Sequence, residues 1–249
     1  MSYAYKLITF LLGVLMVPLT TIMFSRMSRQ AAAKNRDGVL ASLRSSILLI
    51  SLVALPIIAV GMTMANDVVK MIYMRGNSNL ESVKLTGSIL MFYLIGVLGF
   101  GFRDFMNRTF HALQDTKTPF KVACLVVGSN IVLNFILRSL MGANGLALAT
   151  SISGFVGCAV LIILLRKRFG HIGFRSVMKE LVKIVVATAV CAVVCVFMNR
   201  IVPEAIGTLR VFGRLALCAG ASLIVYAICC LVLKVKTLTG LASSLLRRK

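Results

Sequence analysis

Seven long stretches without a charged residue alternate with short polar and basic segments along the 249-residue chain. Most of these stretches are long enough to cross a hydrocarbon core of about 30 Å as a helix of about 20 residues. In lipid, each backbone N–H and C=O group needs a partner within the protein, so separate apolar stretches predict separate membrane helices. The pattern predicts an all-α integral membrane protein with seven transmembrane helices, near residues 7–25, 45–66, 85–102, 122–137, 139–165, 184–199 and 215–233.

Composition supports this fold class. Hydrophobic residues make up 59% of the chain and charged residues 14%, whereas soluble domains have about 45–50% and about 25%. The formal net charge of +21 would indicate nucleic-acid binding on a soluble protein. Here the basic residues lie between apolar stretches, so we expect contacts with membrane lipids and no nucleic-acid partner.

The distribution of basic residues predicts the orientation. The segments 26–44, 103–121, 166–183 and 234–249 hold 20 of the 28 lysines and arginines, which places them in the cytoplasm. The amino terminus is then outside and the carboxy terminus inside. Because residues 1–6 lack the features of a signal peptide, the chain resembles the later part of a larger membrane protein, and we expect a truncated or half-length form.

Local features add detail to the helices. Pro18 predicts an irregularity in the first helix, and residues 67–84 are expected to form an outer loop with a turn at 76–79. The last helix pair, 184–199 and 211–233, is nearly all apolar, so we expect it to face lipid without a charge at membrane depth. Close helix contacts are predicted by small residues in the third and fifth helices, namely Gly87, Gly96, Gly99, Gly101, Ala149, Ser153 and Gly157.

The chain has almost no residues that are candidates for catalysing a reaction on a covalent bond. The chain contains no nucleotide-binding, serine-hydrolase or zinc-protease motif. The seven acidic residues lie outside the apolar stretches, and the seven cysteines lie inside them without metal-ligand spacing. We therefore expect a protein that is not an enzyme and that binds or moves an anionic substrate.

Two groups of polar residues stand out. Arg108 follows Asp104 by four residues, so the two can pair along one helix face; with Arg103 they mark either a helix end leaving the membrane or a substrate site. Asn130 and Asn134 project from one face of the fourth helix, where they either fasten helices together or line a polar site.

The connection before the fourth helix contains residues that are typical of a turn followed by a helix start. Thr118 fits the helix N-cap, and Pro119 fits the first turn. Asp115 can accept hydrogen bonds from free amides in the same turn.

Several segments resemble the carboxy-terminal half of the MurJ (MviN) family of lipid II flippases. The segment from Phe110 to Pro119 is similar to a family pattern of an aromatic residue, Ala and then Asp-Thr-x-Thr-Pro. Tyr3 to Leu7 with Pro18, and Gly145 to Thr150, add to the resemblance. Its family-motif residues here are Asp115, Thr116, Thr118 and Pro119.

The resemblance implies a fold of the MOP superfamily, of which this chain would supply helices eight to fourteen. The implied segments are a carboxy-terminal lobe over 1–165, a basic cytoplasmic loop over 166–183, and a final helix pair with a basic tail over 184–249. The implied location is the bacterial inner membrane.

The implied function is the flipping of lipid II, a peptidoglycan precursor that carries a pyrophosphate, toward the outer leaflet. Its partners would be lipid II, membrane lipids and a separate amino-terminal lobe. The resemblance implies Lys6 as a substrate-binding residue, with a lysine at the outer interface as the alternative. Arg103 and Arg108 are the other expected substrate-binding residues.

Some family members have a cation site, which would correspond here to Asn130, Asn134, the Leu146 carbonyl and Thr150. Such members have an acid at the position of Asn134. No other cofactor is implied, and coupling would use a monovalent cation or the membrane potential. Two alternatives stay open. One is a flippase for another polyprenyl-linked polysaccharide or a MATE-like exporter, and the other is a membrane scaffold that does not transport.

Overall fold

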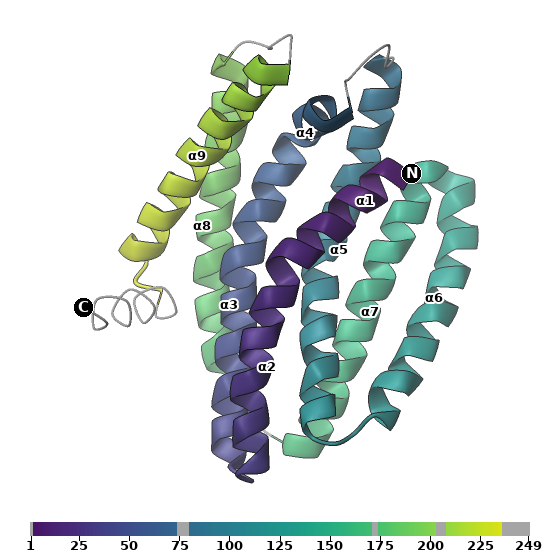
Figure 1. The fold of residues 1–249 in the computed structure, drawn as a ribbon, viewed down its shortest axis with the longest axis vertical. Helices are drawn as coiled ribbons and strands as arrows, with labels where there is room; N and C mark the ends of the chain where they lie inside the picture. Colours follow the sequence, from purple (N-terminus) through teal and green to yellow (C-terminus); the bar gives the residue numbers. More distant parts are fainter. Residues whose placement is uncertain (1, 74–79, 171–173, 203–207, 236–249) are drawn as a thin grey trace. The chain divides into compact units, whose positions relative to one another are not determined.

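The computed structural model describes residues 2–73, 80–170, 174–202 and 208–235, and these ranges are almost entirely helical (Figure 1). Seven helical segments in them are long and apolar enough to cross a membrane, which confirms the predicted all-α fold with seven spans. The elements in chain order are α1 (Ser2–Leu11), η1 (Leu12–Met16), α2 (Val17–Ala32), α3 (Arg36–Thr63), α4 (Ala65–Tyr73), α5 (Leu80–Ala112), α6 (Lys117–Met141), α7 (Ala143–Phe169), α8 (Phe174–Ile201) and α9 (Thr208–Val232).

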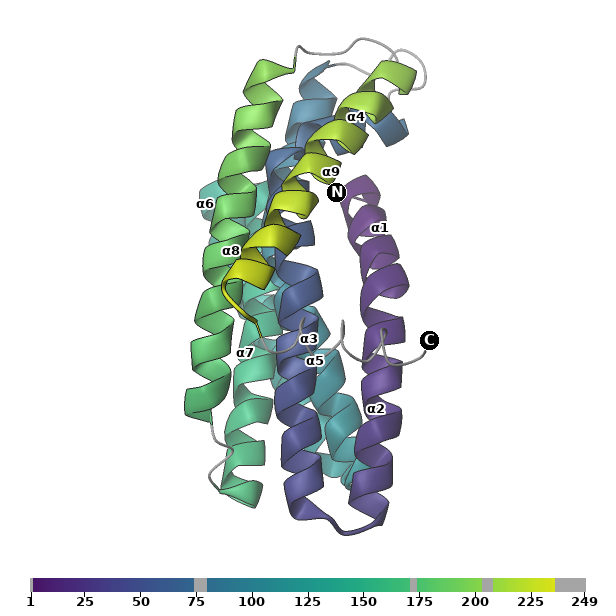
Figure 2. The same cartoon turned by 90° about the vertical axis from the view of Figure 1, so that its left-hand side faces the viewer.

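The first span contains one turn of π-helix. The elements α1, η1 and α2 follow one another without a break (Figure 2), and the N–H of Val17 donates to the carbonyl of Leu12, five residues earlier. Pro18 comes directly afterwards and has no N–H to donate. The irregularity predicted from this proline is therefore present, as a wide turn that precedes it.

One expectation about the outer segments is wrong. Residues 67–73 belong to the helix α4 instead of a loop; the turn predicted at 76–79 lies outside the described residues. In the last helix pair, Arg214 lies close to the start of the candidate span Arg210–Val232 and is only 7% exposed. The expectation of no charge at membrane depth stays a prediction.

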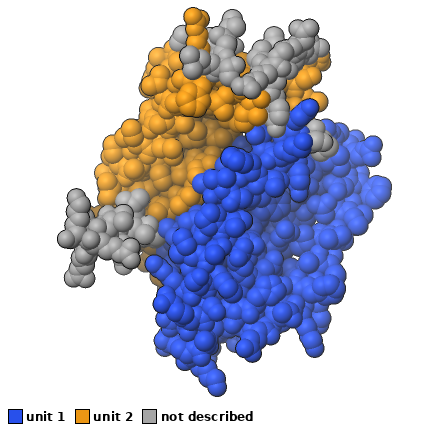
Figure 3. Space-filling view, in the orientation of Figure 1, with its two compact units in different colours: residues 1–50, 92–174 blue, residues 51–91, 175–249 orange. Residues whose placement is uncertain are grey.

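The chain divides into two compact units (Figure 3). Unit 1 comprises residues 1–50 and 92–174, and unit 2 comprises residues 51–91 and 175–249. Helices α3 and α5 are each divided between the two units, with one end in unit 1 and the other end in unit 2. This division follows packing, whereas the segments predicted over 1–165, 166–183 and 184–249 follow sequence order and stay a prediction.

Small residues allow close helix contacts in unit 1. A Cβ atom at Gly96 of α5 would lie 2.9 Å from the Cα of Ser151 in α7, and the Ser151 hydroxyl donates to the carbonyl of Phe92 at 2.7 Å. Helices α6 and α7 meet at Gly142, whose φ of 59° favours glycine. A Cβ at Gly145 would lie 2.0 Å from the Leu137 carbonyl oxygen. The close contact predicted at Gly96 is thus confirmed, whereas the one at Gly145 was not predicted.

The core of unit 2 joins α3 to the last helix pair. Met64, directly after α3, packs with Cys195 of α8 and Cys218 of α9, and all three are at most 1% exposed. The hydroxyl of Tyr226 donates to the carbonyl of Leu52 at 2.9 Å. Helices α8 and α9 therefore bury one face within unit 2, in addition to any face that they turn toward lipid.

Candidate functional site

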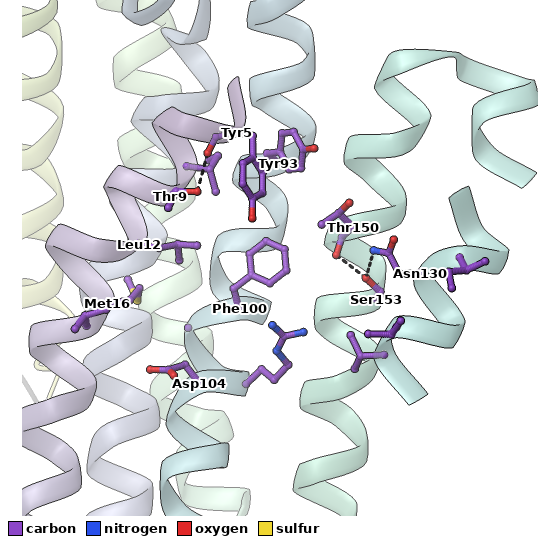
Figure 4. A pocket seen from close by; sticks show the side chains of 17 residues that line it. Tyr5, Thr9, Leu12, Met16, Tyr93, Phe100, Asp104, Asn130, Thr150 and Ser153 are labelled. Atoms are coloured by element: carbon purple, nitrogen blue, oxygen red, sulfur yellow. Dashed lines mark hydrogen bonds between the residues drawn. The ribbon is translucent and has the colours of Figure 1, made fainter. Parts of the chain in front are cut away.

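A cavity of about 460 Å³ lies within unit 1, between the first span and helices α5, α6 and α7 (Figure 4). Most of its lining is apolar, and a few polar side chains project into it, as is usual for a ligand pocket. The lining residues are Tyr5, Ile8, Thr9, Leu12, Met16, Val17, Tyr93, Phe100, Gly101, Arg103, Asp104, Val126, Val127, Asn130, Ile131, Thr150 and Ser153.

Arg103 is the one cation among the described residues that line this cavity. Its guanidinium carbon lies 5.7 Å from the centroid of the Phe100 ring, which is within the range of a cation–π contact. Its stem packs where Gly157 leaves space, because a Cβ there would lie 3.0 Å from the Arg103 Cδ. Within the described part of the chain, Arg103 makes no hydrogen bond or ion pair, so its donors are available to a ligand.

Asp104 of α5 connects two helices of the cavity wall, α2 and α5. Its Oδ2 accepts hydrogen bonds from the Thr20 hydroxyl at 3.0 Å and from the Arg108 Nε at 2.9 Å. The predicted Asp104–Arg108 pair is confirmed, and it neutralises Arg108, which is not among the cavity-lining residues. The contact with Thr20 was not predicted, since nothing in the local pattern around either residue signals a bond across 84 positions.

Lys6 lies outside the lining of the cavity. Its side chain is exposed, whereas its neighbour Tyr5 lines the cavity and contacts the ring of Tyr93 edge-on, with centroids 6.0 Å apart. A substrate-binding role for Lys6 stays a prediction.

A chain of hydrogen bonds joins α6 to α7 along the cavity (Figure 4). Asn134 Nδ2 donates to Asn130 Oδ1 at 2.6 Å, and Asn130 Nδ2 donates to Ser153 Oγ at 2.8 Å. Ser153 in turn donates to the Thr150 carbonyl at 2.8 Å, and Thr150 donates to the Leu146 carbonyl at 2.9 Å. The residues of the implied cation site are therefore brought together in one network.

This network does not form a complete cation site by itself. The Asn134 Oδ1 is buried without a partner among the described atoms, and it is the one acceptor that would suit a cation. The other side-chain groups of the set are already hydrogen-bonded to one another. The set also lacks a carboxylate, the ligand that hard cations prefer. Its geometry fits the fastening of α6 to α7 better than cation binding, and the coupling ion stays a prediction.

The family-motif residues form the connection between α5 and α6. Asp115 accepts hydrogen bonds from the Thr118 backbone N–H at 3.0 Å and from the Thr118 hydroxyl at 2.8 Å, as predicted for free amides of this turn. Arg168, at the end of α7, donates to Asp115 at 3.1 Å. These contacts, led by the Thr118 N–H, lower the pKa of the Asp115 carboxyl.

The start of α6 differs by two residues from the prediction. The helix begins at Lys117, so Thr116 is its N-cap, without a side-chain cap bond, and Thr118 lies inside the first turn. Thr118 bonds to Asp115 instead of capping the helix. Pro119 lies in the first turn as expected and is buried.

Seven candidate spans and a largely apolar cavity with a few polar groups define a multi-pass α-helical membrane protein. A family model described as "Lipid II flippase MurJ" matches residues 1–216. The chain belongs to this family. The family relationship and the seven candidate spans indicate a multi-pass protein of the bacterial inner membrane.

Individual relatives agree with this assignment. A probable lipid II flippase MurJ of Vibrio cholerae is 30% identical over 159 residues, which cover 64% of this chain and 30% of the relative. One of Rhizobium tropici is 24% identical over 201 residues, which cover 80% of this chain and 38% of the relative.

A solved structure shows the same fold. "Lipid II flippase MurJ, inward closed conformation" superposes with a TM-score of 0.69 at 22% identity, covering 93% of this chain and 46% of that chain. The matched residues thus amount to less than half the length of the solved relative.

Proposed function

We propose that the chain forms part of a flippase that moves lipid II from the inner to the outer leaflet of the bacterial inner membrane. The family match over residues 1–216 supports this proposal, as do the names of the relatives. The complete activity would involve a separate amino-terminal lobe. The step is the transfer of an intact lipid across the bilayer, without chemistry on a covalent bond.

The observation that carries the proposal is the position of Arg103. A pyrophosphate crossing a low-dielectric region needs a compensating charge, because bare charge there costs several kcal/mol. Arg103 lines an otherwise mostly apolar cavity, and a planar guanidinium can donate two parallel hydrogen bonds to phosphate oxygens. The contact with the Phe100 ring supports the Arg103 side chain and leaves the N–H donors of Arg103 unused.

Arg108 has a different role in this scheme. Asp104 already binds its guanidinium, so Arg108 holds Asp104 in the cavity wall instead of binding substrate directly. Lys6, exposed one residue from the cavity-lining Tyr5, would meet the anion outside the cavity.

Replacing Arg103 tests this function. In reconstituted membranes that contain the chain with its amino-terminal partner, Arg103→Ala should slow lipid II translocation by about tenfold or more, since a hydrogen bond to a charged group contributes about 1.5–3 kcal/mol. Arg103→Lys should restore part of the rate, because lysine keeps the charge and loses the bidentate fork. Arg138→Ala, an exposed arginine that lines no described cavity, is the control.

Three results would contradict parts of the proposal. An unchanged rate in Arg103→Ala removes the substrate role of this residue. Translocation of another polyprenyl-linked saccharide in place of lipid II changes the substrate. A lack of translocation with any partner lobe favours a membrane scaffold.

The proposed orientation has the amino terminus outside and the carboxy terminus in the cytoplasm, as the loop charges predict. Reporter domains fused to Met1 and Lys249 test it. Active reporters on the same side of the membrane would contradict the seven-span topology.

A further inference from the structure

A second cavity, of about 320 Å³, lies within unit 2 and differs in character from the first. It is found where the end of α3 and the short helix α4 meet the starts of α5 and α9 and the end of α8. Its volume falls at the lower end of the range for ligand pockets, about 300–1,000 Å³. The lining residues are Thr63, Met64, Asn66, Asp67, Lys70, Val83, Lys84, Asn199 and Arg214.

A buried ion pair forms one wall of this cavity. The Arg214 Nη1 lies 3.2 Å from the Asp67 Oδ2, and the two side chains are 7% and 9% exposed. Arg214 Nη2 donates to the backbone oxygen of Asn199 at 2.9 Å and to its side-chain oxygen at 2.7 Å. The Arg214 Nε is buried without an acceptor among the described residues. A buried donor in this state calls for an acceptor.

The cavity carries an excess of positive charge. Lys70 is mostly buried, and its Nζ lies 4.0 Å from the Asp67 Oδ1. Lys84 is exposed and forms no ion pair with any described residue. The lining therefore holds three cations, Lys70, Lys84 and Arg214, against one carboxylate, Asp67. The described lining residues therefore carry a formal net charge of +2.

The cavity lies at the ends of three candidate spans. One span ends at Thr63, another begins at Glu81 and a third begins at Arg210. These positions are at the boundary between apolar helix and polar connection, which is the level of lipid headgroups. A free anion would reach such a cavity from water, whereas a lipid would bring its phosphate there from the bilayer.

We propose that this cavity binds the phosphate group of an anionic membrane lipid. Lys70 and Lys84 supply the net charge, and Arg214 is held in the wall by Asp67 and Asn199. The amide side chains of Asn66 and Asn199 add polar groups to the lining. The proposal concerns unit 2 alone and does not depend on the transport function.

Native mass spectrometry of the purified 249-residue chain tests the site. The probes are phosphatidylglycerol, phosphatidylethanolamine and inorganic phosphate. We expect phosphatidylglycerol to be retained about tenfold better than phosphatidylethanolamine. The double variant Lys70→Gln/Lys84→Gln should lose about thirtyfold in phosphatidylglycerol retention, since each basic residue near a lipid surface contributes about 1 kcal/mol.

The control is Arg210→Gln. Arg210 is exposed, lies one turn before Arg214 in the same helix and does not line the cavity, so its loss should leave retention unchanged. Arg214 itself is left intact because its removal would leave Asp67 buried without its main partner. Thermal unfolding of each variant without lipid shows that the fold is retained.

The outcomes separate the possible ligands. Selective loss in the double variant supports the site. Equal losses in the double variant and in Arg210→Gln, or no loss in either, would overturn it in favour of diffuse attraction. Thermal stabilisation by inorganic phosphate without retention of any lipid would overturn the lipid assignment and leave a free phosphate as the ligand.

Discussion

The two cavities use charge in opposite ways. In unit 1, Arg103 lines a mostly apolar cavity, and the neighbouring polar side chains are neutral except Asp104, whose charge Arg108 balances. In unit 2, three cations and a carboxylate crowd a smaller cavity, with the Asp67–Arg214 pair buried. A single available cation suits a substrate that must bind and leave, whereas a dense charged cluster suits a fixed ligand and a fixed structure.

The largest expected effect on stability concerns the buried Asp67–Arg214 ion pair of unit 2. Arg214→Met should lower the free energy of unfolding by about 3 kcal/mol, because it leaves the Asp67 carboxylate buried without its main partner. Thermal or denaturant unfolding in detergent measures this loss. The control Arg210→Met removes an exposed arginine of the same helix.

The double variant Arg214→Met/Asp67→Leu sharpens this test. It should recover most of the lost stability, since an apolar pair of similar volume often replaces a buried ion pair without cost. A loss in Arg214→Met no greater than in Arg210→Met would show that the pair does not stabilise unit 2.

The packing of α6 against α7, two helices that border the unit 1 cavity, depends on close backbone contact. Gly145→Ala should destabilise the chain by about 2 kcal/mol, because its Cβ would lie 2.0 Å from the Leu137 carbonyl oxygen. Gly128→Ala in α6 is the control; its Cβ meets nothing within 4 Å, so it should be neutral or stabilise by about 0.5–1 kcal/mol. Unfolding experiments that rank the two variants in the reverse order would contradict this packing.

A smaller effect is expected for the neutral network of unit 1. Asn130→Ala removes the acceptor of Asn134 and the donor to Ser153 and should cost about 1 kcal/mol. Ser139→Ala, which loses only a bond to the Ile136 carbonyl within its own helix, should cost less. Equal unfolding midpoints for the two variants would show that the network does not fasten α6 to α7.

The smallest effect concerns Asp115, which lies outside both cavities. Its pKa in the folded chain is lowered from an ordinary value of about 3.9. The ionised carboxylate therefore stabilises the fold fully above that value, and its contribution is lost as the pH falls through the folded pKa. The difference in Tm between the wild-type chain and Asp115→Asn should be present near neutral pH and vanish in acid.

Arg168→Gln is the control for Asp115. It should keep most of this pH dependence, because the Thr118 N–H is the main cause of the lowered pKa and stays in place. A difference in Tm that persists unchanged into acid would contradict the role of the carboxylate.

Local patterns predicted a large share of the fold. The charge-free stretches correspond to the seven spans because hydrocarbon permits few alternatives to a helix. The Asp104–Arg108 pair and the bonds from Thr118 to Asp115 were predictable, since each joins residues within one helical turn. The family motif was recognised from contiguous residues.

The contacts that complete each site could not be predicted in the same way. Thr20 with Asp104, Asp115 with Arg168, and Asp67 with Arg214 are far apart in the sequence. Such pairs depend on which helices pack together, which periodicity in one helix does not reveal. Asp67 and Arg214 were also missed because residues 67–84 have the composition of a loop, while α9 is almost entirely apolar.

The π-helical turn in the first span has a consequence for evolutionary and engineered variants. Leu12 to Met16 place one extra residue in a single turn, which offsets everything downstream by about 100° of helical phase. Tyr5 and Ile8 before the offset, and Val17 after it, nevertheless all line the unit 1 cavity. Deleting one residue from this turn would rotate a different set of side chains into the cavity while leaving both flanking helices intact.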